Sequence, residues 1–182
     1  MLGAEDQSRI ELPELAGRSI LLRGLTPDDA AAVEELLADP QLAAALSPRA
    51  GGERAYSTGR LALSMVLGRE ESALHAGILT REDRRLVGTV SLQSWDRKEG
   101  TATLGYMLKP DCWGQGWAAE AVGLLLNYAQ DTWKLRRVEG RCMDSNLRSA
   151  RVMEKNGMML ARTIPLPGKE GGRINVYVLL HN

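Results

Sequence analysis

A short turn with two glycines, Gly114 and Gly116, carries the clearest chemical signal in this sequence. It lies between an apolar segment ending at Leu108 and an amphipathic segment that starts near Glu120. A turn that opens into a helix leaves several backbone N–H groups without helical partners, and the helix dipole adds partial positive charge there. Glycine lets a ligand approach the backbone closely. Phosphate groups are therefore the expected ligands, although a plain strand-to-helix connection has the same pattern.

Two widespread phosphate-binding motifs do not fit this turn. A P-loop would end in Gly-Lys-Ser or Gly-Lys-Thr, and neither follows Gly116. The GxGxxG fingerprint would require a βαβ unit with an acidic residue for the ribose, and the sequence has no clear unit of that kind. The turn must therefore belong to another class of site if it binds phosphate.

The elements around the turn predict a sheet that positions it. Three apolar segments separated by charged turns indicate an antiparallel meander at 73–80, 86–92 and 101–108. Before them we expect a strand at 19–23, a helix that starts with the capping sequence Thr26 to Asp29, and a helix at 53–67. After the turn we expect a helix at 120–131, a strand at 137–143, a helix at 146–156 and strands at 158–164 and 174–180. This order predicts an α/β protein of the α+β type, with a mixed, mostly antiparallel central sheet flanked by helices.

The composition fits a single globular domain. The 182 residues are 44% hydrophobic, and 23 basic residues balance 23 acidic ones, so no global field favours nucleic acid. No membrane segment or signal peptide is expected, and a cytoplasmic location is the default. Cys112 and Cys142 lack the spacing of a zinc site, so we expect no metal. Residues 1–17 are interpreted as an N-terminal tail or extra strand, and residues 18–182 as the domain.

Two motifs resemble those of one enzyme family. Gly105 to Ala121 match the pattern G-Y-x-L-x-P-x-x-W-G-x-G-x-A-x-E-A almost throughout. This stretch resembles the coenzyme-A loop of the GCN5-related N-acetyltransferases (GNAT), and most closely that of the bacterial ribosomal-protein-alanine N-acetyltransferases (RimJ/RimL-like). The second signature of that family, N-x-x-S-x-x-x-x-E-K-x-G-[FM], is matched by Asn146, Ser149, Glu154, Lys155, Gly157 and Met158.

The resemblance implies the acyl-CoA N-acyltransferase (GNAT) fold and acetyl-CoA as cosubstrate. The acetyl group would pass directly to an amine in a ternary complex, with no metal and no covalent enzyme intermediate. The residues that the resemblance places at the cofactor are Met107, Leu108, Trp113, Gly114, Gln115, Gly116, Trp117, Ala118, Asn146 and Ser149. Backbone amides from Gly114 to Ala118 would hold the pyrophosphate, and backbone groups of Met107 and Leu108 would bind the pantetheine.

Catalytic and acceptor roles also follow from the resemblance. Ser149 would hydrogen-bond the departing thiolate, and the backbone N–H near Leu108 would stabilise the oxyanion. Trp95 and Thr103 lie where relatives place acceptor-binding groups. Each side chain has a simpler alternative role. Asn146 and Ser149 suit a helix start, and Trp95, Trp113 and Trp117 suit packing or a surface turn. His75 is expected to be a hydrogen-bonded strand histidine.

Thr103 departs from the family pattern, because many relatives carry a glutamate there as general base. At neutral pH an α-amine is about one tenth uncharged, whereas a lysine amine is uncharged in only about a few parts in ten thousand. The missing base therefore favours an α-amine acceptor, such as the N-terminus of a ribosomal protein, or indicates a catalytically silent coenzyme-A-binding domain. Acetylation of a small-molecule amine, including an antibiotic, stays open. A nucleotide-binding module also stays open, as does a homodimer through an edge strand.

Overall fold

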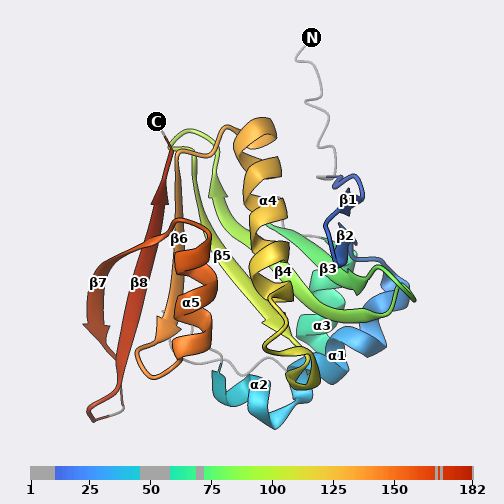
Figure 1. Ribbon diagram of the computed structural model, residues 1–182, viewed down its shortest axis with the longest axis horizontal. Helices are drawn as coiled ribbons and strands as arrows, with labels where there is room; N and C mark the ends of the chain where they lie inside the picture. The colour runs from blue at the N-terminus through green and yellow to red at the C-terminus, as the bar shows by residue number, and fades with distance from the viewer. Residues whose placement is uncertain (1–10, 46–57, 69–71, 167, 169, 182) are drawn as a thin grey trace.

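A mixed sheet of eight strands forms the centre of the computed structural model, which describes residues 11–45, 58–68, 72–166, 168 and 170–181 (Figure 1). The strand order is β1-β2-β3-β4-β5-β6-β8-β7, and every neighbouring pair is antiparallel except β5 and β6. The strands are β1 (Leu15–Ala16), β2 (Ile20–Gly24), β3 (Leu74–Thr80), β4 (Leu86–Asp96), β5 (Thr101–Leu108), β6 (Arg137–Met143), β7 (Met159–Pro165) and β8 (Arg173–Leu180). The predicted fold class is confirmed.

Helices cover both faces of this sheet (Figure 1). They are α1 (Ala30–Ala38), α2 (Pro40–Ala45), α3 (Thr58–Leu67), α4 (Trp117–Trp133) and α5 (Leu147–Lys155), with short 3₁₀ turns η1 (Pro27–Asp29) and η2 (Pro110–Cys112). Helices α4 and α5 lie on one face, and α1 and α3 lie on the other. Among the described residues, no helix is both long and apolar enough to cross a membrane.

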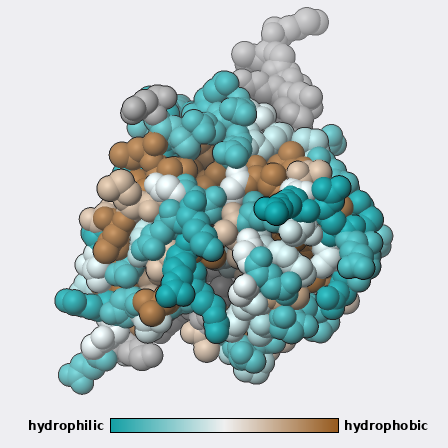
Figure 2. All heavy atoms as spheres, in the orientation of Figure 1, coloured by the Kyte–Doolittle hydropathy of each residue, from teal (hydrophilic) through white to brown (hydrophobic). Residues whose placement is uncertain are grey.

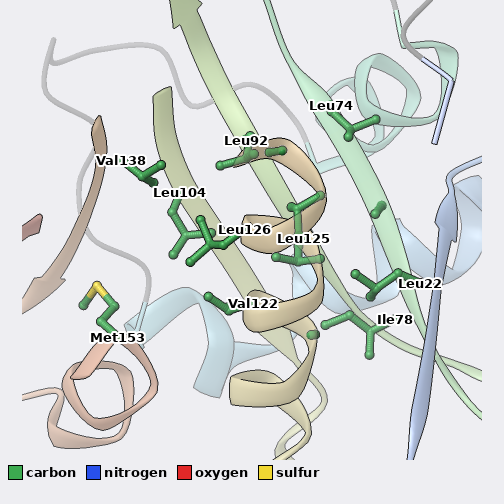
Figure 3. Packing of buried hydrophobic residues seen from close by; sticks show 14 of the residues in the cluster. Leu22, Leu74, Ile78, Leu92, Leu104, Val122, Leu125, Leu126, Val138 and Met153 are labelled. Carbon is green, nitrogen blue, oxygen red and sulfur yellow. The ribbon is translucent and has the colours of Figure 1, made fainter. Parts of the chain in front are cut away.

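Helix α4 anchors the larger of two hydrophobic clusters. Its residues Val122, Leu125 and Leu126 are buried and face the sheet, where they meet residues such as Leu92 and Leu104 (Figure 3). The second cluster joins α1, α2 and α3 to the opposite face of the sheet. Its members include Val33, Leu36, Leu42, Ala62, Val66 and Met107. Because Met107 and Leu108 belong to different clusters, β5 is held from both sides at its end.

The strands β5 and β6 pair over the first part of their length and then separate. They pair only from Thr101 to Leu104 on β5 and from Arg137 to Gly140 on β6. Beyond that point β5 continues from Gly105 to Leu108 and β6 from Arg141 to Met143 without pairing to each other. A gap therefore opens in the sheet next to the glycine turn.

Most predicted bounds agree with the structure. Strand β6 has the predicted bounds, and the capping box between Thr26 and Asp29 is present, although its first turn is the 3₁₀ turn η1. Helix α4 begins at Trp117, three residues before the predicted start. Helix α2 was not predicted. Within the predicted helix at 53–67, residues 58–67 form α3, and 53–57 lie outside the described residues.

Candidate active site

One cavity of about 920 Å³ connects the glycine turn with the opposite face of the sheet through this gap. On one side its lining comes from β5, the turn and α5, including Gly114, Gly116, Asn146 and Ser149. On the other side it comes from α2, α3 and the strands β3 to β6. A ligand bound along the turn and a second ligand bound beside α3 would therefore meet at β5.

The backbone of β5 presents alternate residues to the gap. The N–H of Lys109 donates to the carbonyl oxygen of Val87 on β4 at 2.8 Å. In an antiparallel pair such bonding residues alternate with residues whose backbone groups point away. Tyr106 and Leu108 therefore direct their N–H and C=O groups toward the gap, whereas those of Met107 face β4. The register thus favours Tyr106 over Met107 as the partner of Leu108 in binding a ligand along the strand.

Trp113 ties the turn to the end of β5. Its indole Nε1 donates to the carbonyl oxygen of Leu108 at 2.8 Å. The guanidinium of Arg148 lies over its ring, 4.2 Å from the centroid, so the same indole ring links β5 to the start of α5. Trp113 is thus both a packing residue and part of the cavity lining.

The glycine turn leaves backbone amides available at the start of α4. Gly114 and Gly116 have φ values of 81° and 80°, in the left-handed region that favours glycine. The N–H of Glu120 donates to the carbonyl oxygen of Gly116 at 3.0 Å, which is the first turn of the helix. The preceding amides have no intrahelical acceptor, because each would need a carbonyl before the helix start. Gln115 is exposed at the turn, and Trp117 and Ala118 line the cavity beside it.

Ser149 lies at the centre of a small polar group. The side chain of Asn146 caps α5 by accepting from the Ser149 N–H at 3.2 Å. The hydroxyl of Tyr106 lies 2.6 Å from the Ser149 Oγ, and it also donates to the Ser149 carbonyl oxygen at 2.9 Å. Tyr106 was not predicted as a site residue. The motif G-Y contained it, but only the fold shows that it reaches α5.

The charge of the cavity lining is positive. Arg141, Arg148, Arg151 and Lys155 contribute to it, and no Asp or Glu does so among the described residues. Arg148, Arg151 and Lys155 lie together on α5, and cations gathered on one wall raise the local concentration of an anion. The lining therefore suits a polyanionic ligand such as the pyrophosphate and phosphate groups of coenzyme A.

Beside Arg141, the wall opposite the glycine turn carries polar side chains without a carboxylate among the described residues. Thr103 lines it together with Gln93 and His75. The Nδ1 of His75 lies 2.7 Å from the Oγ of Ser91, so the imidazole is hydrogen-bonded within the sheet as expected for a strand histidine. Thr103 supplies no carboxylate at this wall.

Trp95 lies away from the cavity. Its ring stacks on that of Trp133 at the end of α4, with centroids 4.1 Å apart and an angle of 14° between the planes. The guanidinium of Arg97 covers it at 4.7 Å. The cavity lining thus includes Thr103 and the residues predicted at the cofactor except Gln115, which is exposed at the turn, but it does not include Trp95.

The sequence matches the family model described as "Acetyltransferase (GNAT) domain" over residues 19–159. A probable N-acetyltransferase, YjcK of Bacillus subtilis, is 44% identical over 89 residues, which cover 48% of this chain. The matched stretch spans 49% of the length of YjcK. An uncharacterized N-acetyltransferase of the same species, YoaA, is 25% identical over 150 residues, covering 80% of this chain and 82% of YoaA.

Solved structures share the fold. The ribosomal L7/L12 alpha-N-protein acetyltransferase RimL, in complex with coenzyme A, has a TM-score of 0.77 at 18% identity, covering 92% of this chain and 98% of RimL. The match to RimL shows the fold alone, and the family follows from the model that spans most of the chain. The chain belongs to the GNAT acetyltransferase family and is an acetyl-CoA-dependent N-acetyltransferase.

Proposed function

We propose that this protein acetylates the α-amine at the N-terminus of a polypeptide by direct transfer from acetyl-CoA in a ternary complex. The observation that carries this proposal is the gap between β5 and β6, which joins the two sides of one cavity. A thioester on the side of the glycine turn and an amine on the side of α3 would meet there without a covalent enzyme intermediate. Holding both reactants in one site removes much of the entropic barrier to transfer.

The cofactor side has the groups that coenzyme A needs. Amides from Gly114 to Ala118 would hold the pyrophosphate, and Arg148, Arg151 and Lys155 would add charge for the phosphates. Backbone groups of Tyr106 would bind the pantetheine, with Asn146 beside them and the Leu108 N–H next to the thioester. The glycine turn fits this role, since a Cβ atom built on Gly114 or Gly116 meets no atom within 4 Å and the space in front of the backbone is open.

The chemistry requires few groups, because a thioester is already activated. The uncharged amine nitrogen attacks the thioester carbonyl carbon, the C–S bond breaks, and the nitrogen loses a proton to water. The N–H of Leu108 points into the gap and would stabilise the oxyanion. Ser149 would hydrogen-bond the thiolate, which takes a proton from water and leaves as the thiol. No metal is needed for any of these steps.

The missing carboxylate on the opposite wall supports an α-amine as the acceptor. Thr103 offers no carboxylate base there, and an α-amine needs less help than a lysine amine to lose its proton. RimL acts on the α-amine of a ribosomal protein according to its name, and a structure of similar fold from Vibrio fischeri is a ribosomal-protein-S5-alanine acetyltransferase, with a TM-score of 0.77 at 16% identity. It covers 93% of this chain and 97% of its own. Both support a polypeptide N-terminus as the acceptor.

The test compares two peptides that differ only in which amine is free. One peptide has a free α-amine and no lysine, and the other is N-terminally blocked and carries one lysine. We expect thiol release with the first peptide and little with the second. A preference for lysine would contradict the proposal. Tight acetyl-CoA binding by calorimetry, without release on these peptides or on small amines, would indicate a silent domain.

A matched pair of variants tests the cofactor side. Gly116→Ala places a side chain at a left-handed position in the turn, and Gly171→Ala does the same at φ 75° in the loop before β8, with open space at both. We expect Gly116→Ala to weaken acetyl-CoA binding about tenfold or more, since the amides at the turn change direction. Gly171→Ala should leave the affinity unchanged. Equal effects would remove the turn from the proposed cofactor site.

A further inference from the structure

Three arginines surround one carboxylate on the sheet face of β6. The Glu139 Oε1 accepts from the Arg141 Nε at 3.0 Å and from the Arg141 Nη2 at 2.8 Å. The guanidinium of Arg162 on β7 lies 3.4 Å from both carboxylate oxygens of Glu139. Arg137 approaches its Oε2 at 3.5 Å. We name these four residues the arginine cluster.

The arginine cluster has a surplus of positive charge. Burial opposes the ionisation of Glu139, but hydrogen bonds and charges from Arg141, Arg162 and Arg137 outweigh it and lower the pKa of the carboxyl. Three guanidinium groups therefore share a single ionised carboxylate. The side chain of Glu139 is only 17% exposed, whereas that of Arg162 is 47% exposed. The surplus charge thus faces solvent, while the compensating charge lies beneath it.

The arginine cluster leads away from the cavity across three strands. Arg141 lines the cavity beside the gap. In the sheet register Arg141 on β6 and Arg162 on β7 both pair with Val176 of the intervening strand β8. Val176 is 0% exposed, as expected if the long arginine side chains cover it. Arg141 and Arg162 therefore lie on the same face of the sheet, between the opening of the cavity and the edge strand β7.

We propose that the arginine cluster binds acidic residues that follow the acceptor amine in the acceptor polypeptide. This inference rests on the proposed function, because it takes a polypeptide N-terminus as the acceptor. With the amine at the gap, the following residues leave the cavity past Arg141. Two strand spacings separate β6 from β7, and about three residues of an extended chain cover that distance. Carboxylates within the first few residues would reach Arg141 and then Arg162.

An acidic peptide fits these features better than a nucleic acid does. The chain as a whole has no net charge, so it lacks the extended positive field that holds a polyanion. The arginine cluster is short, and one of its members belongs to the cavity in which an amine would be acetylated. Guanidinium groups also match carboxylates in a planar, bidentate way.

The experiment uses the full chain and three peptides with the same first residue and a free α-amine. Their next residues are glutamates, glutamines or arginines, so that no peptide carries a lysine amine. We expect kcat/KM from thiol release to rank glutamate above glutamine and glutamine above arginine. Each exposed ion pair should contribute between about 1.4-fold and fivefold at low salt. The ranking should weaken as the salt concentration rises, because the pairs are exposed.

Two arginine variants on β7 and β8 separate a direct contact from a general charge effect. Arg162→Gln removes one cation of the arginine cluster without touching the cavity lining. Arg173→Gln removes an exposed cation of β8 at a position whose side chain alternates to the opposite face from Val176. We expect Arg162→Gln to reduce the glutamate-over-glutamine preference by a factor of about two to five, and Arg173→Gln to leave it unchanged. Acetyl-CoA affinity should be the same in both variants and the wild type.

Several results would overturn the inference. Equal rates on the glutamate and glutamine peptides, or equal losses with Arg162→Gln and Arg173→Gln, would do so while leaving the proposed function intact. A single-stranded oligonucleotide that binds more tightly than the glutamate peptide, and does so through Arg162, would assign the arginine cluster to nucleic acid. Release on none of the peptides would remove the proposed acceptor, and this inference with it.

Discussion

Ser149 and Tyr106 form a hydroxyl pair at the point where the thiolate would leave. Burial raises the pKa of Tyr106 well above its ordinary value, and the hydrogen bond with Ser149 only partly offsets this. Tyr106 therefore keeps its proton throughout the neutral range. When the Ser149 Oγ, 2.6 Å away, accepts the single hydroxyl proton of Tyr106, the serine hydroxyl can donate its own proton toward the gap. The pair holds a proton close to the expected sulfur.

Replacing Ser149 by alanine tests this role. We expect Ser149→Ala to lower kcat by about 10- to 100-fold, because the thiolate loses a positioned hydrogen-bond donor. Acetyl-CoA affinity should change by less than about twofold, since backbone groups carry most of the proposed binding. Thiol release and calorimetry measure the two quantities. Ser145→Ala, an exposed serine just before α5, is the control. A wild-type kcat in Ser149→Ala would leave the serine as a helix residue only.

At the scale of elements, the close approach of β4 and β5 sets the position of Leu108. A Cβ atom on Gly88 would lie within van der Waals overlap of the Met107 carbonyl oxygen and 3.0 Å from the Leu108 Cα. Both neighbours are backbone atoms, which cannot rotate away. The end of β5 therefore depends on glycine at this position of β4.

Gly88→Ala should displace the end of β5. We expect a loss of about 1–3 kcal/mol in the free energy of unfolding, the range typical of overpacking. Acetyl-CoA affinity should also fall, because the Leu108 backbone moves with the strand. Gly24→Ala on β2 is a matched control, since a Cβ atom there meets nothing within 4 Å. Urea unfolding and calorimetry on both variants check the prediction. A Gly88→Ala protein as stable as Gly24→Ala would contradict it.

Glu120 joins the first turn of α4 to the start of β2. Its Oε1 accepts from the Ser19 N–H at 2.7 Å and from the Ile20 N–H at 3.4 Å. A carboxylate at this end of α4 also interacts favourably with the helix dipole. We expect Glu120→Ala to lower the free energy of unfolding by about 1–2 kcal/mol. Asp131→Ala, an exposed residue of the same helix, should change it little. If urea unfolding shows equal losses in the two variants, this bridge has no special role.

Sequence patterns predicted the elements whose signal is local. Strand β6 alternates buried Val138, Gly140 and Cys142 with less buried neighbours, and its bounds were correct. Helix α2 is only six residues long, and within residues 40–44 only Leu42 is buried, so the segment shows no helical periodicity. A start signal was present nonetheless, because the Asp39 carboxylate accepts from the Gln41 N–H at 2.8 Å, just beyond Pro40.

Other features of the site depend on contacts between distant segments. The choice of Tyr106 over Met107 depends on which β5 residues bond to β4, and a single sequence does not fix that register. The hydrogen bond from Trp113 to Leu108 and the stacking of Trp95 on Trp133 likewise require the folded sheet. The arginine cluster joins residues of β6 and β7, which lie apart in the sheet with β8 between them.

At the scale of the whole molecule, charge is unevenly distributed although the totals balance. Cations gather in the cavity lining and in the arginine cluster. Among the described residues, several acidic groups are used within the fold. Glu120 bridges α4 and β2, and Asp29 bonds Arg23 at the entry to α1. A neutral protein can therefore present a positive site, because part of its negative charge is bound in structural contacts.

Asp29 joins the helical layer of α1 to the sheet. Its two carboxylate oxygens accept from the Arg23 guanidinium at 2.8 and 3.0 Å, and one also accepts from the Thr26 N–H at 2.8 Å. The side chain is 10% exposed. Burial opposes its ionisation, but the hydrogen bonds from Arg23 and Thr26 outweigh burial and hold the pKa of Asp29 below its usual value. Ionised Asp29 therefore stabilises the folded protein.

The sign of this contribution predicts its pH dependence. Because the pKa of Asp29 is lower in the folded than in the unfolded chain, its stabilisation is fully present above the unfolded value of about 3.9 and is lost as the pH falls through the folded value. We expect Asp29→Asn to lower the free energy of unfolding at pH 7 by about 1–3 kcal/mol, and the difference from wild type to shrink below about pH 4. Asp28→Asn, its exposed neighbour, should cost little at any pH. Urea unfolding of all three proteins across this pH range measures these differences. If the difference between Asp29→Asn and wild type stays constant with pH, the carboxylate charge is not what stabilises this junction.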